Sequence, residues 1–168
     1  MKNIYLTGFM GTGKTAVGKE LAFLTGMELI DMDDAIEAEQ KERIPEIFKK
    51  RGEEAFRNME TELLARLAQR GGLIVSCGGG VPVRNRNVEI MKKSGVVLLL
   101  YADARTIYER VRNSDRPMLA DDMSIGRIEE LMEKRRGSYE AAADAAIDTS
   151  AGTPMELAKK AAELAGQV

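Results

Sequence analysis

The sequence predicts an α/β fold of three layers, in which helices cover both faces of a five-stranded parallel sheet. Short apolar runs alternate with longer segments in which apolar residues recur every three or four positions. The runs are apolar throughout, as expected for strands that are buried on both faces. We therefore expect five strands, at residues 4–7, 29–31, 73–77, 96–101 and 145–148.

The helices between these strands follow from apolar spacing and end signals. The first carries Val17, Leu21 and Leu24 at helical spacing and stops at Gly26. Residues 33–70 are long enough for two or three helices before the third strand, and the last of these has an apolar stripe formed by Phe56, Met59, Leu63 and Leu67. The final helix starts at Thr153 and Pro154, which are typical of the N-cap and first helical positions.

Two stretches exceed the plain alternation of strand and helix. We interpret residues 33–60 and 113–124 as insertions in a single domain of residues 1–168, because no linker or repeat separates them from the rest. Insertions of this size in an α/β core usually bind or cover a ligand. The first is expected to bind the substrate, and the second is expected to act as a lid.

Composition excludes several classes of function. The 168 residues carry 25 basic and 27 acidic side chains, so no broad basic surface is available for nucleic acid, and an anionic ligand must be small and locally held. The chain has no histidine, which excludes histidine bases, Ser-His-Asp triads and histidine-bound zinc. A single cysteine, Cys77, excludes an internal disulfide and is expected to be a buried thiol. With no apolar run that could span a membrane, we expect a cytoplasmic protein without nucleic-acid or membrane partners.

The strongest motif is the segment Gly8-Phe9-Met10-Gly11-Thr12-Gly13-Lys14-Thr15. It matches G-x-x-x-x-G-K-[ST] and lies directly between a predicted strand and a predicted helix, as the phosphate-binding P-loop requires. Its backbone N–H groups and the helix N-terminus would face phosphate oxygens, with Lys14 at the β- and γ-phosphates and the Thr15 hydroxyl on Mg²⁺. A GTPase-like nucleotide switch remains an alternative, although the chain has neither N-K-x-D nor D-x-x-G.

A group of aspartates follows the second strand. On an extended strand end Asp31 and Asp33 point the same way, so two carboxylates emerge beside the P-loop at the C-terminal edge of the sheet. Asp34 and Glu37 stand in the relation of a capping box, which predicts that Asp34 caps the next helix.

Further along, the chain carries Phe56-Arg57, a glycine triple at residues 78–80 after Cys77, Arg116 before Pro117-Met118-Leu119, and Arg135 four residues before Tyr139. With the P-loop and the paired aspartates, this ordered set resembles the shikimate kinase family almost from end to end. The resemblance implies a P-loop kinase fold and Mg-ATP-dependent phosphorylation of the 3-hydroxyl of shikimate. The products would be shikimate 3-phosphate and ADP, in aromatic amino-acid biosynthesis.

The resemblance also implies a role for each matching residue. Asp31 would hold Mg²⁺ together with Thr15, and Asp33 would bind the substrate hydroxyls and act as the base. Arg57 and Arg135 would clamp the shikimate carboxylate, which is a ligand that suits bidentate guanidinium groups. The glycines Gly78, Gly79 and Gly80 would lie against the substrate ring.

The remaining implied roles concern the nucleotide. Lys14 and the lid residue Arg116 would stabilise the charge of the transferred phosphoryl group, and Arg110 would lie near the adenine. The residues expected to contact the nucleotide are Gly11, Thr12, Gly13, Lys14, Thr15, Ala16, Arg110, Arg116 and Gly152.

Two further points qualify this interpretation. Another small-metabolite kinase, such as one of the gluconate type, is the nearest alternative. The pair Arg57 and Arg135 argues against a neutral sugar as substrate, because such a sugar would not need two guanidinium groups. Gly137 and Ser138 stand where the family usually has a Pro-Leu pair, which predicts a looser turn after Arg135. Tyr139 is interpreted as a packing residue, and we expect the chain to act as a monomer.

Overall fold

A computed structural model describes residues 1–112 and 124–167 and contains the predicted parallel sheet. The strand order is β2-β3-β1-β4-β5, with every neighbouring pair parallel. The strands are β1 (Asn3–Thr7), β2 (Glu28–Asp31), β3 (Leu73–Ser76), β4 (Gly95–Tyr101) and β5 (Ala145–Asp148). All five lie where the sequence predicted them, with ends that differ by at most one residue.

The helices connect these strands in the predicted order. They are α1 (Lys14–Thr25), α2 (Met32–Gln40), α3 (Ile44–Arg70), α4 (Asn85–Ser94), α5 (Ala104–Arg112), α6 (Ile125–Ala142) and α7 (Pro154–Gln167), with a short 3-10 turn η1 (Val81–Val83). The region between β2 and β3 forms two helices, and α3 is kinked at Gly52, whose φ of 82° is not helical. The predicted start of α7 is confirmed, because Thr153 and Glu156 exchange side-chain to backbone hydrogen bonds.

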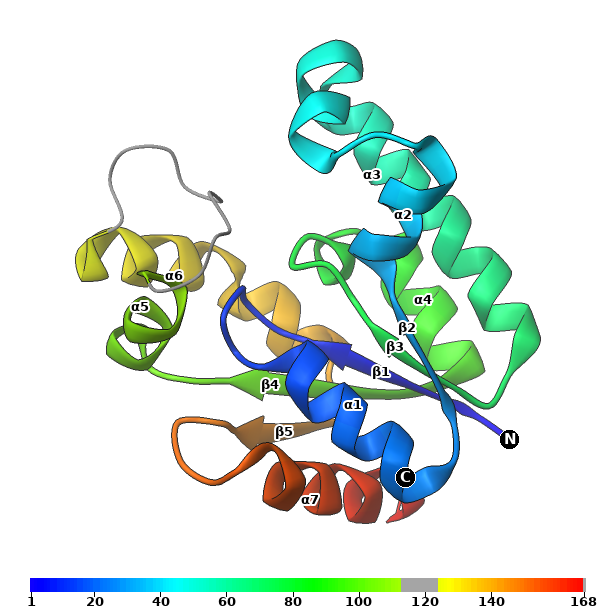
Figure 1. Cartoon of the computed structure of the whole chain (residues 1–168), viewed down its shortest axis with the longest axis vertical. Coiled ribbons are helices and arrows are strands. Elements are labelled where there is room, and N and C mark those ends of the chain that lie inside the picture. The colour runs from blue at the N-terminus through cyan, green and yellow to red at the C-terminus, as the bar shows by residue number, and fades with distance from the viewer. Residues whose placement is uncertain (113–123, 168) are drawn as a thin grey trace.

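The two faces of the sheet are covered by different helices (Figure 1). Along β1, Tyr5 packs with residues of α3 and α4, whereas Ile4 and Leu6 pack with α1 and α7. This alternation follows from the period of two of a β-strand. The apolar stripe of α1 is shorter than predicted, because Val17 and Leu21 are buried but Leu24 is 40% exposed.

The register of the sheet brings three loops to one edge. Leu6, Ser76 and Asp31 are aligned across β1, β3 and β2, so all three strands end side by side. The P-loop, the aspartate segment and the glycine triple therefore leave the sheet together at its carboxyl edge, which is where α/β folds bind ligands. A backbone hydrogen bond of 2.9 Å from the Cys77 N–H to the Leu6 carbonyl joins two of these loops.

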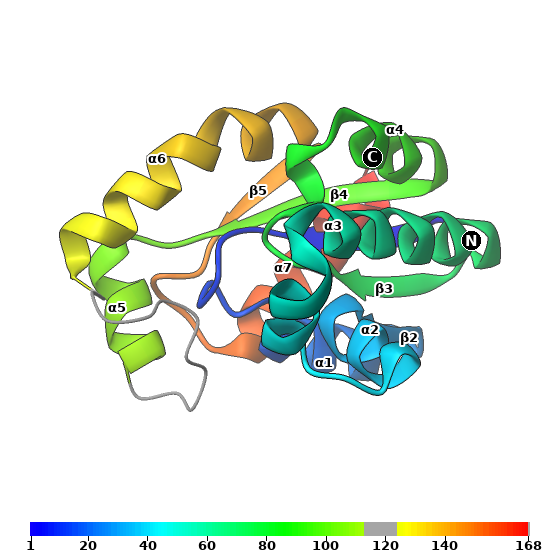
Figure 2. The ribbon, with the colours of Figure 1, turned by 90° about the horizontal axis from the view of Figure 1, so that it is seen from above.

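Helices flank this edge on two sides. Figures 1 and 2 show α2 and the first half of α3 on one side, and α5 and α6 on the other. The predicted lid at residues 113–124 lies almost entirely outside the described residues, and Arg116 lies outside them. No helix within residues 1–112 and 124–167 is both long and apolar enough to cross a membrane.

Candidate active site

The P-loop has a backbone that only glycine adopts readily at several positions. Gly8, Gly11 and Gly13 have φ angles of 142°, 75° and 92°. A Cβ atom on Gly8 would lie 2.2 Å from the carbonyl oxygen of Leu100, so the loop turns directly against β4. The Thr12 hydroxyl donates to the Phe9 carbonyl at 2.8 Å and closes the loop on itself.

The N-terminus of α1 is prepared for an anion. Gly13 is its N-cap, and no side chain among the described residues caps the helix there. Its first N–H groups and the positive end of its dipole are thus available to phosphate oxygens. Lys14 folds over the loop and donates to the carbonyls of Gly8 and Phe9 at 2.9 and 3.0 Å. Ala16 lies in the first turn of the helix and is exposed.

Asp31 joins the P-loop to the start of α2. Its Oδ2 accepts a hydrogen bond from the Thr15 hydroxyl at 2.9 Å, and its Oδ1 accepts from the N–H groups of Asp33 and Asp34 at 3.1 and 3.4 Å. The predicted capping by Asp34 is therefore wrong. The strand ends at Asp31, which keeps extended backbone angles and itself caps the helix beginning at Met32. Asp33 consequently lies in the first helical turn rather than on the strand.

Thr15 and Asp31 are the candidate magnesium ligands that the structure brings together. Within the described ranges no group of three acidic or cysteine side chains forms a metal cage. Mg²⁺ is commonly bound by one or two protein ligands, with nucleotide phosphates and water completing its octahedron. The adjoining oxygens of Thr15 and Asp31, beside the phosphate loop, fit this pattern.

Asp33, unlike Asp31, lies against the glycine triple. A Cβ on Gly78 would lie 2.9 Å from both the Asp33 Oδ1 and the Glu60 Oε1, so any side chain there would displace the carboxylates. A Cβ on Gly80 would lie 2.0 Å from the Arg57 Nη1. Three polar side chains from α2 and α3 are thus packed directly against a bare backbone.

Arg57 is held by two glutamates of its own helix. Its Nη1 donates to Glu60 at 2.8 Å, and its Nη2 donates to Glu53 at 3.3 Å. Its side chain is only 17% exposed. Burial works to lower the pKa of Arg57, but the two carboxylates outweigh it and raise the pKa, so the guanidinium stays charged. Arg57 thus forms ion pairs within its own helix, as exposed helix arginines commonly do. Here, however, the paired guanidinium is largely buried and lies against Gly80.

Glu60 is a site residue that the sequence analysis missed. It is 1% exposed, and its Oε1 is a buried oxygen without a hydrogen-bond partner among the described residues. Burial raises the pKa of Glu60, partly offset by Arg57. Its spacing of three residues from Arg57 was visible in the sequence, but the same spacing is typical of solvated ion pairs on exposed helices.

Arg135 approaches from α6. Its guanidinium carbon lies 6.0 Å from the centre of the Phe9 ring, and its Nη1 would lie 3.2 Å from a Cβ on Gly79. Both expected carboxylate-binding arginines therefore border the glycine triple, Arg57 at Gly80 and Arg135 at Gly79. The looser turn predicted from Gly137 and Ser138 is absent, because α6 continues as one helix through both.

On the nucleotide side, Arg110 links the P-loop to the segment after β5. Its Nη1 donates to the Gly11 carbonyl and to the Thr149 hydroxyl, each at 3.2 Å. The Thr149 hydroxyl in turn donates to the Thr12 carbonyl at 2.7 Å. Gly152 lies in the same segment with a φ of 94°. The structure thus brings together the expected nucleotide residues that it describes.

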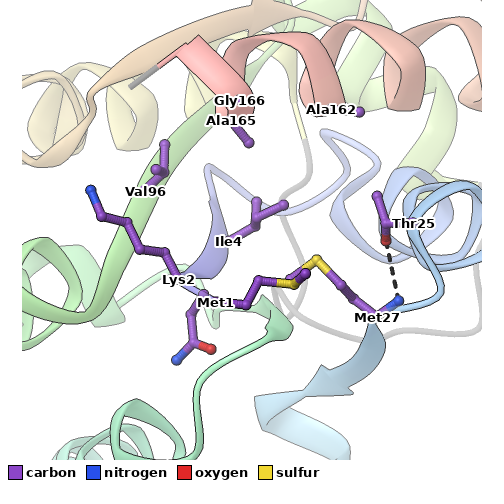
Figure 3. A pocket seen from close by; sticks show the side chains of 10 residues that line it. Met1, Lys2, Ile4, Thr25, Met27, Val96, Ala162, Ala165 and Gly166 are labelled. Carbon is purple, nitrogen blue, oxygen red and sulfur yellow. Dashed lines mark hydrogen bonds between the residues drawn. The ribbon is translucent and has the colours of Figure 1, made fainter.

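A separate cavity of about 210 Å³ lies at the other end of the sheet (Figure 3). It is lined by the first residues of β1 and β4, including Ile4 and Val96, and by the last turns of α1 and α7. The P-loop leaves the opposite, carboxyl end of β1. This cavity is therefore not part of the site assembled around the glycine triple.

Comparisons with known proteins agree with this geometry. A family model described as shikimate kinase matches residues 10–165. The shikimate kinase of Thermodesulfovibrio yellowstonii is 43% identical over 161 residues, covering 95% of this chain and 92% of that protein. That of Persephonella marina is 40% identical and covers 94% of each chain.

Solved structures give the same result. The shikimate kinase from Acinetobacter baumannii in complex with shikimate superposes with a TM-score of 0.91 at 38% identity, covering 98% of this chain and 92% of that one. The enzyme from Aquifex aeolicus gives 0.81 at 30% identity, covering 98% and 97%. A gluconokinase from Sinorhizobium meliloti gives 0.61 at only 19% identity, a likeness of fold alone.

Proposed function

The chain belongs to the shikimate kinase family, and on this premise we propose which of its residues carry out the reaction. The protein is an ATP-dependent phosphotransferase that phosphorylates the 3-hydroxyl of shikimate and yields shikimate 3-phosphate and ADP. One observation supports the assignment most directly. Asp33, Arg57 and Arg135, from three different helices, converge on one glycine triple beside the P-loop.

The P-loop end is proposed to bind the ATP phosphates. Phosphoryl transfer passes through a loose transition state whose charge lies on the equatorial oxygens, so positioned positive groups supply most of the catalysis. The N–H groups at the start of α1 and the Lys14 ammonium would provide them here, since Lys14 already lies over the loop. Arg116, in the segment predicted to act as a lid, is proposed to add a further positive charge.

Magnesium is proposed to be held by Thr15 and Asp31. When bound, it would neutralise charge on the β- and γ-phosphate oxygens. The Thr15 hydroxyl and the Asp31 Oδ2 are already 2.9 Å apart, so little rearrangement is needed to present both oxygens. The hydrogen bonds that Asp31 accepts from the start of α2 fix its carboxylate in this orientation.

Asp33 is proposed to orient the 3-hydroxyl and to accept its proton late in the transfer. Both carboxylate oxygens of Asp31 accept hydrogen bonds, from the Thr15 hydroxyl and from the first N–H groups of α2. The Asp33 Oδ1 instead faces the glycine triple. The division of roles also limits repulsion, because magnesium would neutralise one of the two neighbouring carboxylates.

The carboxylate of shikimate is proposed to bind between Arg57 and Arg135. Both guanidinium groups border the glycine triple, and a planar guanidinium matches a carboxylate with two parallel hydrogen bonds. Because Gly78, Gly79 and Gly80 present bare backbone, the substrate ring can approach closely.

The role of Asp33 can be tested by Asp33→Asn, with the neighbouring exposed residue changed in Asp34→Asn as the matched control. We expect the shikimate-dependent kcat for ADP release to fall by at least about a hundredfold in Asp33→Asn. It should change less than about twofold in Asp34→Asn. A near-normal kcat in Asp33→Asn would remove Asp33 from the mechanism.

A further inference from the structure

Tyr139 lies one helical turn after Arg135 on α6 and is only 5% exposed. Its position in the apolar cluster of α5 and α6 accounts for the ring but not for the hydroxyl. The hydroxyl leaves that cluster and donates a hydrogen bond of 2.7 Å to the carbonyl of Gly79. A residue predicted to pack therefore also makes a polar contact with the glycine triple.

The surroundings of Gly79 show why this contact matters. A Cβ on Gly79 would lie 3.2 Å from the Arg135 Nη1, 3.4 Å from the Tyr139 hydroxyl and 3.8 Å from the Gly8 carbonyl. The glycine triple, α6 and the P-loop thus meet at one point. Arg135, which is expected to bind the substrate carboxylate, is therefore next to the bare backbone that is expected to face the substrate ring.

The direction of the hydrogen bond at Tyr139 is fixed by chemistry. A backbone carbonyl only accepts, so the Tyr139 hydroxyl donates its proton to the Gly79 carbonyl. The lone pairs of the hydroxyl oxygen remain available to the positive charge of Arg135, whose Nη1 borders the same glycine. Burial raises the pKa of Tyr139, so the hydroxyl keeps the proton that it donates at neutral pH.

We propose that Tyr139 is a positioning residue whose hydroxyl anchors α6, and with it Arg135, to the glycine triple at the spacing that shikimate requires. This inference rests on the proposed role of Arg135 in binding the shikimate carboxylate. The helical turn between Arg135 and Tyr139 contains Gly137, which leaves the backbone more freedom than other residues would. A hydrogen bond from this turn to Gly79 would limit that freedom.

The test is Tyr139→Phe, which removes the hydroxyl and keeps the ring. We expect the KM for shikimate to rise about five- to tenfold, because the variant loses the one hydrogen bond that joins α6 to Gly79 at the substrate site. The kcat at saturating shikimate and the KM for ATP should each stay within about twofold. The dissociation constant for shikimate, measured by calorimetry without nucleotide, should rise by the same factor as KM.

Tyr5→Phe is the matched control. Tyr5 is fully buried, and its hydroxyl makes a 2.7 Å hydrogen bond to Ser94 far from the glycine triple. The Tyr5→Phe variant should lower the thermal midpoint by about as much as Tyr139→Phe does, but it should leave the KM for shikimate unchanged. Thermal midpoints of both variants separate loss of positioning from loss of folded protein.

Several results would overturn the proposal. If the KM for shikimate is unchanged in Tyr139→Phe, the hydroxyl has only a structural role. The same conclusion follows if kcat falls and both KM values rise by similar factors. The same increase in the KM for shikimate in Tyr5→Phe would show this too. Failure of the unaltered protein to release ADP in response to shikimate would instead contradict the proposed function. The two failures are therefore distinguishable.

Discussion

The phosphate end and the acid end of the site are built in different ways. The phosphate end comes almost entirely from one continuous segment, Gly8 to Thr15, whose own hydrogen bonds close the loop. The acid end is assembled from α2, α3, α6 and the glycine triple, which are far apart in the chain. The sheet order β2-β3-β1 and its aligned strand ends bring these segments together.

This difference has a functional consequence. In the P-loop, the groups proposed to act on the phosphates are positioned by their own backbone. In the acid end, Arg57 is held by Glu60, and Arg135 is near Tyr139, so residues behind the substrate surface set its geometry. Substitutions at the phosphate end, and of the proposed base Asp33, should therefore change catalysis, whereas those of Arg57 and Arg135 should change substrate affinity.

The largest effect is expected from Lys14→Met. Loss of the positive charge at the transferred phosphoryl group should lower kcat by at least about a hundredfold, with the KM for shikimate changed less than about threefold. Steady-state kinetics with both substrates varied would measure this. Lys19→Met, an exposed lysine on the same helix, is the matched control and should keep normal kcat. A large change in the KM for shikimate in Lys14→Met would contradict the separate roles of the phosphate end and the acid end.

Arg57→Ala should give the converse result. Removing a charged partner of the substrate carboxylate is expected to raise the KM for shikimate about ten- to a hundredfold, while kcat falls less than about tenfold. Arg66→Ala, on the same helix but paired with the exposed Glu39, should leave both constants unchanged. If Arg57→Ala lowered kcat and left KM intact, the assignment of Arg57 to substrate binding would be wrong.

Glu60→Gln sharpens the comparison through pH. Burial raises the folded-state pKa of Glu60, so this group stabilises the fold at low pH, and that contribution is lost as pH rises through the raised pKa. The glutamine variant has no such loss. Its unfolding free energy relative to the unaltered protein should therefore increase from about pH 4.3, the usual glutamate value, towards neutrality.

Denaturant unfolding at a series of pH values measures this difference. Glu53→Gln is the control, because Glu53 also pairs with Arg57 but its side chain is 68% exposed. We expect a nearly flat difference for Glu53→Gln. If the unfolding free energy of Glu60→Gln relative to the unaltered protein stays constant or falls with pH, the pKa of Glu60 is not raised by burial.

The smallest effect is expected at Gly137. A Cβ there meets no atom of the described residues within 4 Å, and the residue lies inside a continuous helix. Gly137→Ala should stabilise the protein by about 0.5–1 kcal/mol and leave the KM for shikimate unchanged. Thermal unfolding would register an increase of a few degrees. A decrease would mean that the turn after Arg135 is not helical in solution.

What the sequence predicted follows the same division. The five strands and the P-loop were predicted because their signals are local: apolar runs, glycine spacing and a strand-to-helix context. The order of the residues at the acid end indicated which ones would meet. It could not indicate that Asp31 rather than Asp34 caps α2, because this depends on where the strand ends by a single residue.

Two other features could not be predicted for a related reason. The burial of Glu60 and the contact of the Tyr139 hydroxyl with Gly79 depend on how closely α3 and α6 approach the glycine triple. Such approach distances come from packing between elements and have no period or motif in the sequence. Both features lie at the acid end, where positions are set by distant segments.

The account is tested most directly by measuring ADP release from Mg-ATP by the purified protein with shikimate, with gluconate, with a nucleoside monophosphate and with no acceptor. We predict strong stimulation by shikimate alone, because Arg57 and Arg135 border the glycine triple, whose bare backbone leaves room for a ring beside the bound carboxylate. Equal stimulation by gluconate, or nucleotide binding without stimulation by any acceptor, would contradict the claim that the acid end selects shikimate.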